Sequence, residues 1–98
     1  MVIYRRMTPE DVPPISRLEE ETFSMPWSAD SFLEMIGKED ARYYVAEEDG
    51  RILGGCGVLM IAGEGNITNV VVTPEDRNRG IATAMLRHLM AEGDKEGL

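Results

Sequence analysis

Apolar residues recur at helical spacing near the N-terminus. Residues 8–11 (Thr-Pro-Glu-Asp) supply an N-cap residue, a proline at the first helical position and acidic residues in the first turn. The positions that follow on one helical face are Val12, Ile15, Leu18 and Thr22. This spacing predicts an amphipathic helix over residues 9–21. Because Pro13 and Pro14 disturb its first turns, its start can be delayed to residue 14.

A second helical pattern follows the break at residues 24–27. Ser28 is expected to cap this helix, and Gly37 is expected to end it. One side of the helix carries Phe32, Leu33 and Ile36. Ahead of both helices, residues 1–6 are rich in β-forming side chains and predict a short first strand.

The middle of the chain changes to the pattern of β-strands. Residues 42–47 predict a strand by β-propensity. Asp49 and Gly50 form a two-residue hairpin signal, because the turn needs a positive φ that glycine accepts readily. The returning strand covers residues 51–61 and contains three glycines, Gly54, Gly55 and Gly57. Glycines inside a strand predict a bulge or a close approach of another backbone.

A last strand and a last helix complete the pattern. Residues 63–65 predict a turn, and residues 66–73 predict a strand that Pro74 ends. Its apolar run, Val70 to Val72, is typical of a central strand covered on both faces. Residues 80–93 then predict a helix whose apolar side carries Ile81, Met85, His88 and Leu89. The order β-α-α-β-β-β-α predicts an antiparallel meander with helices, an α+β fold.

Composition narrows the function classes. The 98 residues fit one domain, and 43% hydrophobic with 29% charged residues is a globular composition. A net charge of −8 argues against nucleic acid as a partner. The single cysteine excludes an intrachain disulfide framework and multi-cysteine zinc sites, and no metal site is predicted. No apolar stretch is long enough for a membrane, and residues 1–10 lack a secretory signal, so we expect a cytoplasmic protein.

The segment that carries chemistry lies between the last strand and the last helix. The unpaired N–H groups and positive dipole end of a helix N-terminus bind anions. Gly80 and Ala82 keep side-chain bulk away from those amides, and Arg77 and Arg79 add charge that a phosphate would satisfy. The segment predicts a pyrophosphate cradle, although it is neither a P-loop nor a dinucleotide-binding glycine motif. The alternative is a plain strand-to-helix turn with solvated arginines.

The residues of this segment resemble a known family motif. The run Arg77-Asn78-Arg79-Gly80-Ile81-Ala82 is similar to the Gln/Arg-x-x-Gly-x-Gly/Ala motif of the GCN5-related N-acetyltransferases, the GNAT family. The resemblance implies that this loop binds the pyrophosphate of acetyl-CoA, the cosubstrate. It also implies that the preceding strand binds the pantetheine arm and polarises the thioester carbonyl. The implied cofactor-binding residues are Val70, Val71, Val72, Arg77, Asn78, Arg79, Gly80, Ile81, Ala82 and Thr83. A main-chain N–H of Val71 or Val72 could stabilise the developing oxyanion.

Three further segments resemble the ribosomal-protein-alanine N-acetyltransferases within that family. They are residues 15–19, residues 25–28 with Phe32, and residues 67–74. The resemblance implies an acetyl-CoA-dependent N-acetyltransferase that acts on the N-terminal α-amine of a ribosomal protein. Two alternatives stay open. One is an acetyltransferase of the same fold acting on lysine or a small amine, and the other is a non-catalytic fragment for CoA binding or protein contacts.

The resemblance also implies that residues 1–98 form a single incomplete N-acetyltransferase domain. The family fold continues with another strand and helix, which in related N-terminal acetyltransferases carry a glutamate base and a tyrosine acid. Neither position exists in these residues, so no catalytic residue is assigned. The strand at residues 70–72 would then lack a neighbour on one edge, and we expect the 98-residue chain to self-associate there.

Four other residues have two readings each. Cys56 is expected to be a buried, inert thiol rather than a nucleophile. His88 is expected to pack in the core rather than act as a base. Trp27 either anchors the loop that, by the resemblance, borders the acceptor peptide, or packs in the core. Glu64 lies either near the acceptor or in a solvated turn.

Overall fold

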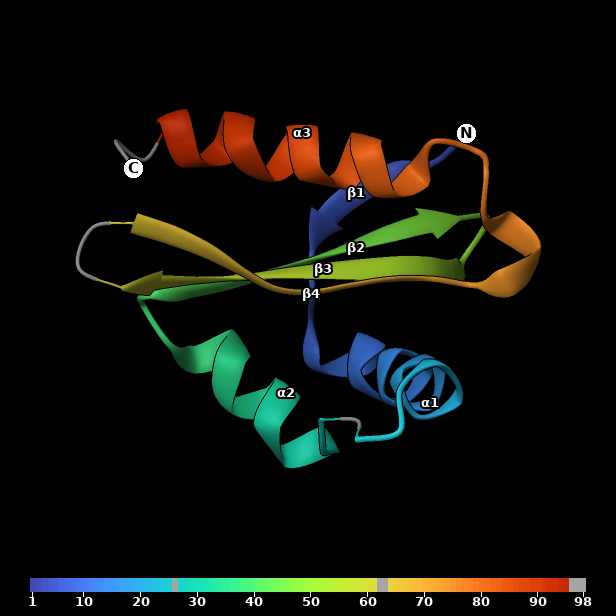
Figure 1. Ribbon diagram of the computed structural model, residues 1–98, viewed down its shortest axis with the longest axis horizontal. Coiled ribbons are helices and arrows are strands. Elements are labelled where there is room, and N and C mark those ends of the chain that lie inside the picture. Colours follow the sequence, from blue (N-terminus) through green and yellow to red (C-terminus); the bar gives the residue numbers. More distant parts are fainter. Residues whose placement is uncertain (26, 62–63, 96–98) are drawn as a thin grey trace.

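Helices cover both faces of a four-stranded antiparallel sheet in the part of the chain that the structure describes (Figure 1). The structure is a computed structural model, and it describes residues 1–25, 27–61 and 64–95. Its elements are β1 (Ile3–Arg6), α1 (Val12–Thr22), α2 (Ala29–Gly37), β2 (Ala41–Glu48), β3 (Arg51–Ile61), β4 (Glu64–Val72) and α3 (Ile81–Lys95). Short 3-10 turns occupy Pro9–Asp11 and Pro74–Asp76. The predicted element order and the α+β class are confirmed.

The four strands follow one another in space as they do in sequence. The order is β1-β2-β3-β4 and each neighbouring pair is antiparallel, which confirms the meander. The predicted hairpin turn joins β2 to β3, with φ of 52° at Asp49 and 81° at Gly50. Both residues are therefore in the left-handed region that this tight turn requires.

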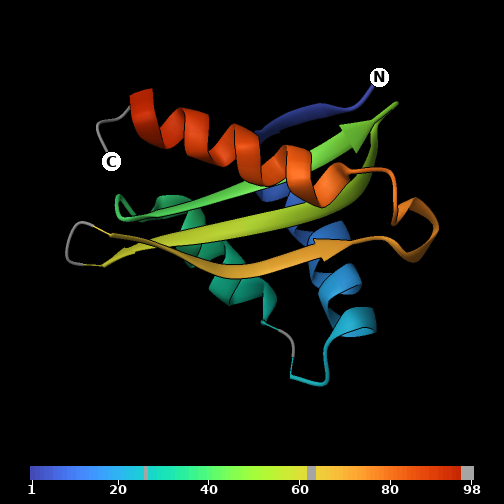
Figure 2. The same ribbon diagram turned by 45° about the horizontal axis from the view of Figure 1, so that its top comes forward.

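The position of β4 agrees with the expectation that one of its edges lacks a neighbour, although its apolar run is typical of a central strand. Among the described residues β4 is an edge strand, paired with β3 on one side only. Both of its faces are nevertheless covered, because α3 packs on one face of the sheet and α1 on the other (Figures 1 and 2). The apolar run at residues 70–72 therefore indicates that both faces of the strand are covered, and not that the strand is central in the sheet.

The sheet separates two hydrophobic clusters. The cluster under α1 and α2 contains Met7, Val12, Ile15, Phe32, Met35, Ala41, Tyr43 and Val45. The cluster under α3 contains Tyr44, Ala46, Leu53, Cys56, Val58, Ile81, Met85 and Leu89. Alternate side chains of β2 point into opposite clusters, as the pleat of a strand requires. The chain thus builds a three-layer sandwich with the sheet in the middle.

The first helix begins at neither of the predicted residues. Residues 9–11 form a 3-10 turn, closed by a capping box between Thr8 and Asp11, and α1 then starts at Val12. Pro13 and Pro14 fall in the first turn of α1, where their missing N–H groups have no helical partner to lose. The prolines are therefore compatible with the helix start instead of delaying it.

The second helix confirms its predicted cap but not its whole predicted face. The Ser28 Oγ accepts a hydrogen bond from the N–H of Ser31 at 3.2 Å, and α2 ends at Gly37. Phe32 and Met35 are buried, whereas Leu33 is 46% exposed. At about 100° per residue, Leu33 lies away from the stripe that Phe32 and Met35 direct toward the sheet.

The glycines of β3 allow close contacts, as predicted. A Cβ added at Gly54 would collide with the carbonyl oxygen of Val71, and one at Gly57 would collide with the side chain of Thr68. Two bulges accompany these glycines. One lies between Ala46 and Glu47 of β2, whose partners are Gly54 and Ile52, and the other lies between Gly57 and Val58, whose partners on β4 are Asn69 and Ile67. Thr68 is therefore the extra residue of β4 at this point.

Only part of the turn predicted at residues 63–65 lies within the described residues. Glu64 and Gly65 belong to β4, because Glu64 already pairs with Ile61. The turn prediction is wrong for these two residues, and Gly63 lies outside the described residues.

Candidate functional site

The N-terminus of α3 has the main-chain geometry of an anion site. The loop that precedes it passes through Asn78 and Gly80, both in the left-handed region with φ of 70° and 75°. The helical hydrogen bonds of α3 begin with the N–H of Ala84, which donates to the carbonyl of Gly80 at 3.0 Å. The N–H groups of residues 81–83 precede this bond and point out of the helix end. They combine with the positive end of the helix dipole to favour a negative ligand.

An open pocket of about 240 Å³ lies at this helix end. Its lining residues are Val72, Asp76, Arg77, Asn78, Gly80, Ile81, Ala82 and Thr83. Most residues of the predicted cofactor site are thus brought together at one place. A Cβ at Gly80 would meet open space, so this glycine serves the positive φ of the loop rather than a close approach.

The two arginines of the motif have different surroundings. Arg77 lines the pocket, is exposed, and donates from Nε to the carbonyl of Val72 at 3.3 Å. Arg79 turns aside, with Nη1 at 2.7 Å from Asp76 and Nη2 at 3.2 Å from Glu48. Of the two, Arg77 is the arginine placed to meet an anion in the pocket, while the charge of Arg79 is already balanced by two carboxylates.

Asp76 organises this loop and was missed in the sequence. Its carboxylate accepts hydrogen bonds from the hydroxyl of Thr73 and from Arg79, and Arg51 lies at 3.3 Å. The hydrogen bond from Thr73, together with the arginines, lowers the pKa of Asp76. The available signal was the threonine three residues before an aspartate, which is the spacing of a capping interaction.

The outer edge of β4 presents alternate main-chain groups. The N–H of Thr73 donates to the carbonyl of Leu53 on β3 at 2.7 Å. Main-chain groups of successive residues in a strand point to opposite sides, so those of Val71 face β3 and those of Val70 and Val72 face the open edge. The contact from Arg77 to the Val72 carbonyl agrees with this direction. Of the two N–H groups named for the oxyanion, only that of Val72 points outward.

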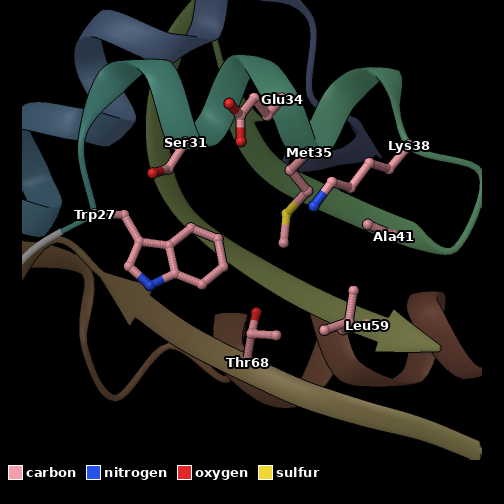
Figure 3. A pocket seen from close by; sticks show the side chains of 8 residues that line it. All are labelled: Trp27, Ser31, Glu34, Met35, Lys38, Ala41, Leu59 and Thr68. Atoms are coloured by element: carbon pink, nitrogen blue, oxygen red, sulfur yellow. The ribbon is translucent and has the colours of Figure 1, made fainter. Parts of the chain in front are cut away.

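Two pockets lie on the opposite face of the sheet, beside the loop between α1 and α2. One, of about 330 Å³, is lined by Glu19, Phe23, Ser24, Met25, Trp27, Thr68 and Asn69. The other, of about 250 Å³, is lined by Trp27, Ser31, Glu34, Met35, Lys38, Ala41, Leu59 and Thr68. Figure 3 shows the second pocket between α2 and the strands, with the indole of Trp27 at one end. Because Trp27 and Thr68 belong to both, the pockets adjoin.

The structure shows the surroundings of three residues for which the sequence left two interpretations. Trp27 is half-buried and packs on Phe32 at 5.4 Å between ring centroids, so it both anchors its loop and lines the pockets. Cys56 is buried, as predicted, and burial raises the pKa of its thiol to about 11, which favours the unreactive protonated form. His88 packs edge-on against Tyr44 at 5.3 Å but is only half-buried, so it lies at the margin of the core and not within it as predicted. The side chain of Glu64 lies outside the described part of the structure.

Glu19 is a second residue that the sequence analysis missed. This glutamate of α1 is buried, and the side-chain amide of Asn69 donates to its carboxylate. Burial raises the pKa of Glu19. The signal was its position, because residue 19 lies on the same helical stripe as Val12 and Ile15, where an apolar residue is expected.

The meander, the edge strand with both faces covered, and the pocket at the start of α3 together define an α+β protein of the acyl-CoA N-acyltransferase fold. The chain belongs to the Acetyltransferase (GNAT) family, whose profile matches residues 12–98. The fold and family expected from the motif are therefore confirmed.

Known proteins resemble both the sequence and the structure. A candidate ribosomal protein bS18-alanine N-acetyltransferase of Bacillus subtilis is 33% identical over 84 residues, which are 85% of this chain and 56% of that protein. The ribosomal-protein-S18-alanine N-acetyltransferase of Escherichia coli superposes with a TM-score of 0.85 at 23% identity, over 99% of this chain and 62% of that one. The PaiA N-acetyltransferase of Thermoplasma acidophilum, solved with coenzyme A, gives a TM-score of 0.85 at 17% identity, over 99% and 74%.

The chain thus spans little more than half the length of the Bacillus subtilis relative. In the described residues, no helix has the length and apolar character needed to cross a membrane.

Proposed function

We propose that this protein is an acetyl-CoA-dependent N-acetyltransferase. The observation that carries the proposal is the open pocket at the N-terminus of α3, where unpaired amides and Arg77 face one space. Family membership and the coenzyme A in the Thermoplasma acidophilum structure support the same cosubstrate. The pocket and its small residue Ala82 fit a pyrophosphate, whose negative charge matches both the helix dipole and the guanidinium.

The residues of the proposed cofactor site divide by what each group can do. The amides of residues 81–83 would hold the pyrophosphate, with Arg77 as its cationic partner and Asn78 and Gly80 shaping the loop.

The outward main-chain groups of Val70 and Val72 would hold the pantetheine arm, and the N–H of Val72 would face the thioester oxygen. Val71 would act through packing, because its side chain is buried and its main chain faces β3. Arg79 would hold the loop through Asp76 and Glu48.

We further propose that the acceptor is the α-amine at the N-terminus of a protein. The names of the Bacillus subtilis and Escherichia coli relatives support this class of acceptor. Chemistry favours it as well, because an α-amine has a pKa of about 7.7–8.0 and lysine one of about 10.4. An α-amine is therefore partly neutral at physiological pH and needs less help to lose its proton.

Calorimetric titration with acetyl-CoA tests the cofactor half of the proposal. Arg77→Glu should weaken binding by about tenfold or more, because it places a carboxylate beside the pyrophosphate. Arg87→Glu makes the same change of charge at an exposed position of α3 away from the pocket, so its affinity should stay within about twofold of the wild type. Absence of binding, or equal effects of the two substitutions, would contradict the proposal.

Mass spectrometry of peptides incubated with the protein and acetyl-CoA tests the acceptor half. One peptide has a free α-amine and no lysine, and the other has a blocked N-terminus and one lysine. Acetylation of the first alone is expected. Acetylation of the second alone would favour the lysine-directed alternative.

A further inference from the structure

Glu19 on α1 is a buried carboxylate that has no positive partner among the described residues. It is 2% exposed, and the Nδ2 of Asn69 donates to its Oε2 at 3.0 Å and to its Oε1 at 3.3 Å. The main-chain N–H of Trp27 also faces this carboxylate and favours its charged form. Among the residues that the structure describes, no lysine, arginine or amino group lies within ion-pair distance of it. The negative charge is therefore hydrogen-bonded but not neutralised.

This arrangement disfavours the charged form of the Glu19 carboxylate when no ligand is bound. Burial raises the pKa of Glu19, and the hydrogen bond from Asn69 and the nearby N–H of Trp27 offset only part of that effect. The neighbouring phenol of Tyr43 is also buried, and its hydroxyl makes no hydrogen bond of standard geometry within the described residues. Polar groups held in unfavourable surroundings are typical of sites where a ligand completes the interactions.

Glu19 lines the 330 Å³ pocket beside the loop between α1 and α2. The described lining contains no basic residue and includes two aromatic rings, those of Phe23 and Trp27. An aromatic face next to a carboxylate attracts a cation, first through the full charge and then through the ring quadrupole. A cationic group is therefore the ligand that this lining would accept.

The bulge in β4 arranges the polar side of the pocket. Thr68 is the extra residue, so Thr68 and Asn69 both line this pocket although they are adjacent in the strand. The Oγ1 of Thr68 donates to the Oδ1 of Asn69 at 3.0 Å, which leaves the Nδ2 of Asn69 to donate to Glu19. The carboxylate is thus held in one orientation by a chain of hydrogen bonds that starts at the bulge.

We propose that Glu19 is the counter-ion of a primary ammonium group, the amino end of the acceptor peptide, which binds in this pocket beside Trp27. Only the identification of that ammonium with the acceptor rests on the proposed function. The location agrees with it, because Asn69 directly precedes Val70, the first residue of the segment assigned to the cosubstrate. A peptide bound here would place its amine at the bulge, next to the outward main-chain groups of β4.

The wild-type protein gives the first test, because Trp27 is the sole tryptophan of the chain and lines the pocket. The probe is the tetrapeptide amide Ala-Ala-Ala-Ala with a free amino end, and its control is the same peptide with an acetylated amino end. The indole N–H signal of Trp27 should shift in a saturable way with the free peptide and not with the acetylated one. Equal shifts with both peptides, or none with either, would overturn the proposal.

Two isosteric substitutions on α1 give the second test. Glu19→Gln keeps a side chain able to accept from Asn69 but removes the charge, whereas Glu20→Gln removes one charge at the next, exposed position. Glu19→Gln should weaken binding of the free peptide by about tenfold or more, since it removes one member of a buried charge pair. Glu20→Gln should stay within about twofold of the wild type. If Glu19 only ties α1 to β4, the two variants will bind alike and the proposal fails.

Two measurements on the same samples separate the possible failures. Thermal unfolding shows whether Glu19→Gln is folded, and because it removes a buried charge we expect it to melt no lower than Glu20→Gln. Calorimetry with acetyl-CoA tests the proposed function independently. Peptide binding without acetyl-CoA binding would overturn the proposed function and leave the ammonium site, and the reverse result would overturn the ammonium site alone.

Discussion

Two of the buried carboxylates in this protein, Asp11 and Glu19, have opposite surroundings. Asp11 forms a paired contact with Arg5, from Nη1 to Oδ2 at 2.6 Å and from Nη2 to Oδ1 at 2.9 Å. Burial alone would raise the pKa of Asp11, but the hydrogen bonds from Arg5 and Thr8 outweigh it and hold that pKa below its usual value. Among the described residues the donors that face Glu19 are neutral, and burial raises its pKa. The first carboxylate stabilises the fold, whereas the second is available to a ligand.

Asp11→Asn should destabilise the protein at neutral pH by about 1–2 kcal/mol, a figure reduced because Arg5 is partly exposed. The pKa of Asp11 is lower in the folded state, so its contribution is complete above the ordinary carboxylate pKa of about 3.9 and is lost as the pH falls through the folded value. Urea unfolding of wild type and variant should therefore converge below about pH 4.

Asp40→Asn, at an exposed position, is the control and should have a small effect at every pH. A constant difference between wild type and Asp11→Asn down to pH 2–3 would show that the ion pair is not responsible.

At the scale of elements, β3 is built to lie unusually close to its neighbours. Gly54 approaches the carbonyl of Val71, and Gly57 approaches Thr68 at the bulge. Both contacts hold β4 in the register that directs Val72 outward and places Asn69 beside Glu19. The glycines that weaken β3 as an isolated strand therefore position both sides of the candidate site.

Gly54→Ala should destabilise the protein by about 1–3 kcal/mol, because its Cβ forces β3 and β4 apart in a packed region. Gly37→Ala is the matched control, since a Cβ there meets open space at the end of α2, and its effect should be within about 1 kcal/mol. Urea unfolding midpoints measure both. A Gly54→Ala protein as stable as Gly37→Ala would show that the close contact is not maintained in solution.

At the scale of the whole molecule, the edge of β4 offers hydrogen-bonding groups to another strand. We expect the 98-residue chain to self-associate through this edge, and sedimentation velocity should show a species larger than the monomer that grows with concentration. Ile67→Lys, which adds a charge at a 48% exposed position of β4, should shift the protein toward monomer. Leu33→Lys makes the same change at a 46% exposed position of α2 and should not. A monomer at every concentration would be incompatible with this expectation.

Local sequence was sufficient for most of the elements. The tetrapeptide Thr-Pro-Glu-Asp occurs at residues 8–11 and again at residues 73–76, and in both places it forms a 3-10 turn with a threonine-to-aspartate hydrogen bond. Such a turn depends on neighbours within four residues, so the sequence determines it. The hairpin at Asp49 and the cap at Ser28 were predictable for the same reason.

The structure that follows this tetrapeptide differs between its two copies and depends on residues distant in sequence. After residue 11 the chain enters α1 at once, whereas after residue 76 it makes a left-handed loop before α3. The carboxylate of the first turn is bound by Arg5 from β1, and that of the second by Arg79 and Arg51. Partners distant in sequence cannot be read from a local pattern, because the sheet brings them together.

The sequence by itself determined the family motif, the element order and the proposed anion site at the start of α3, because each depends on neighbouring residues. Only the tertiary structure showed which groups of that motif face outward. It directed Arg77 to the pocket and Arg79 to carboxylates, and it turned Val72 rather than Val71 to the open edge. It also buried Glu19 against Asn69, 50 positions away in sequence, through the packing of α1 on a bulged strand. The sequence shows which side chains can carry a charge, but whether that charge is neutralised depends on the fold around it.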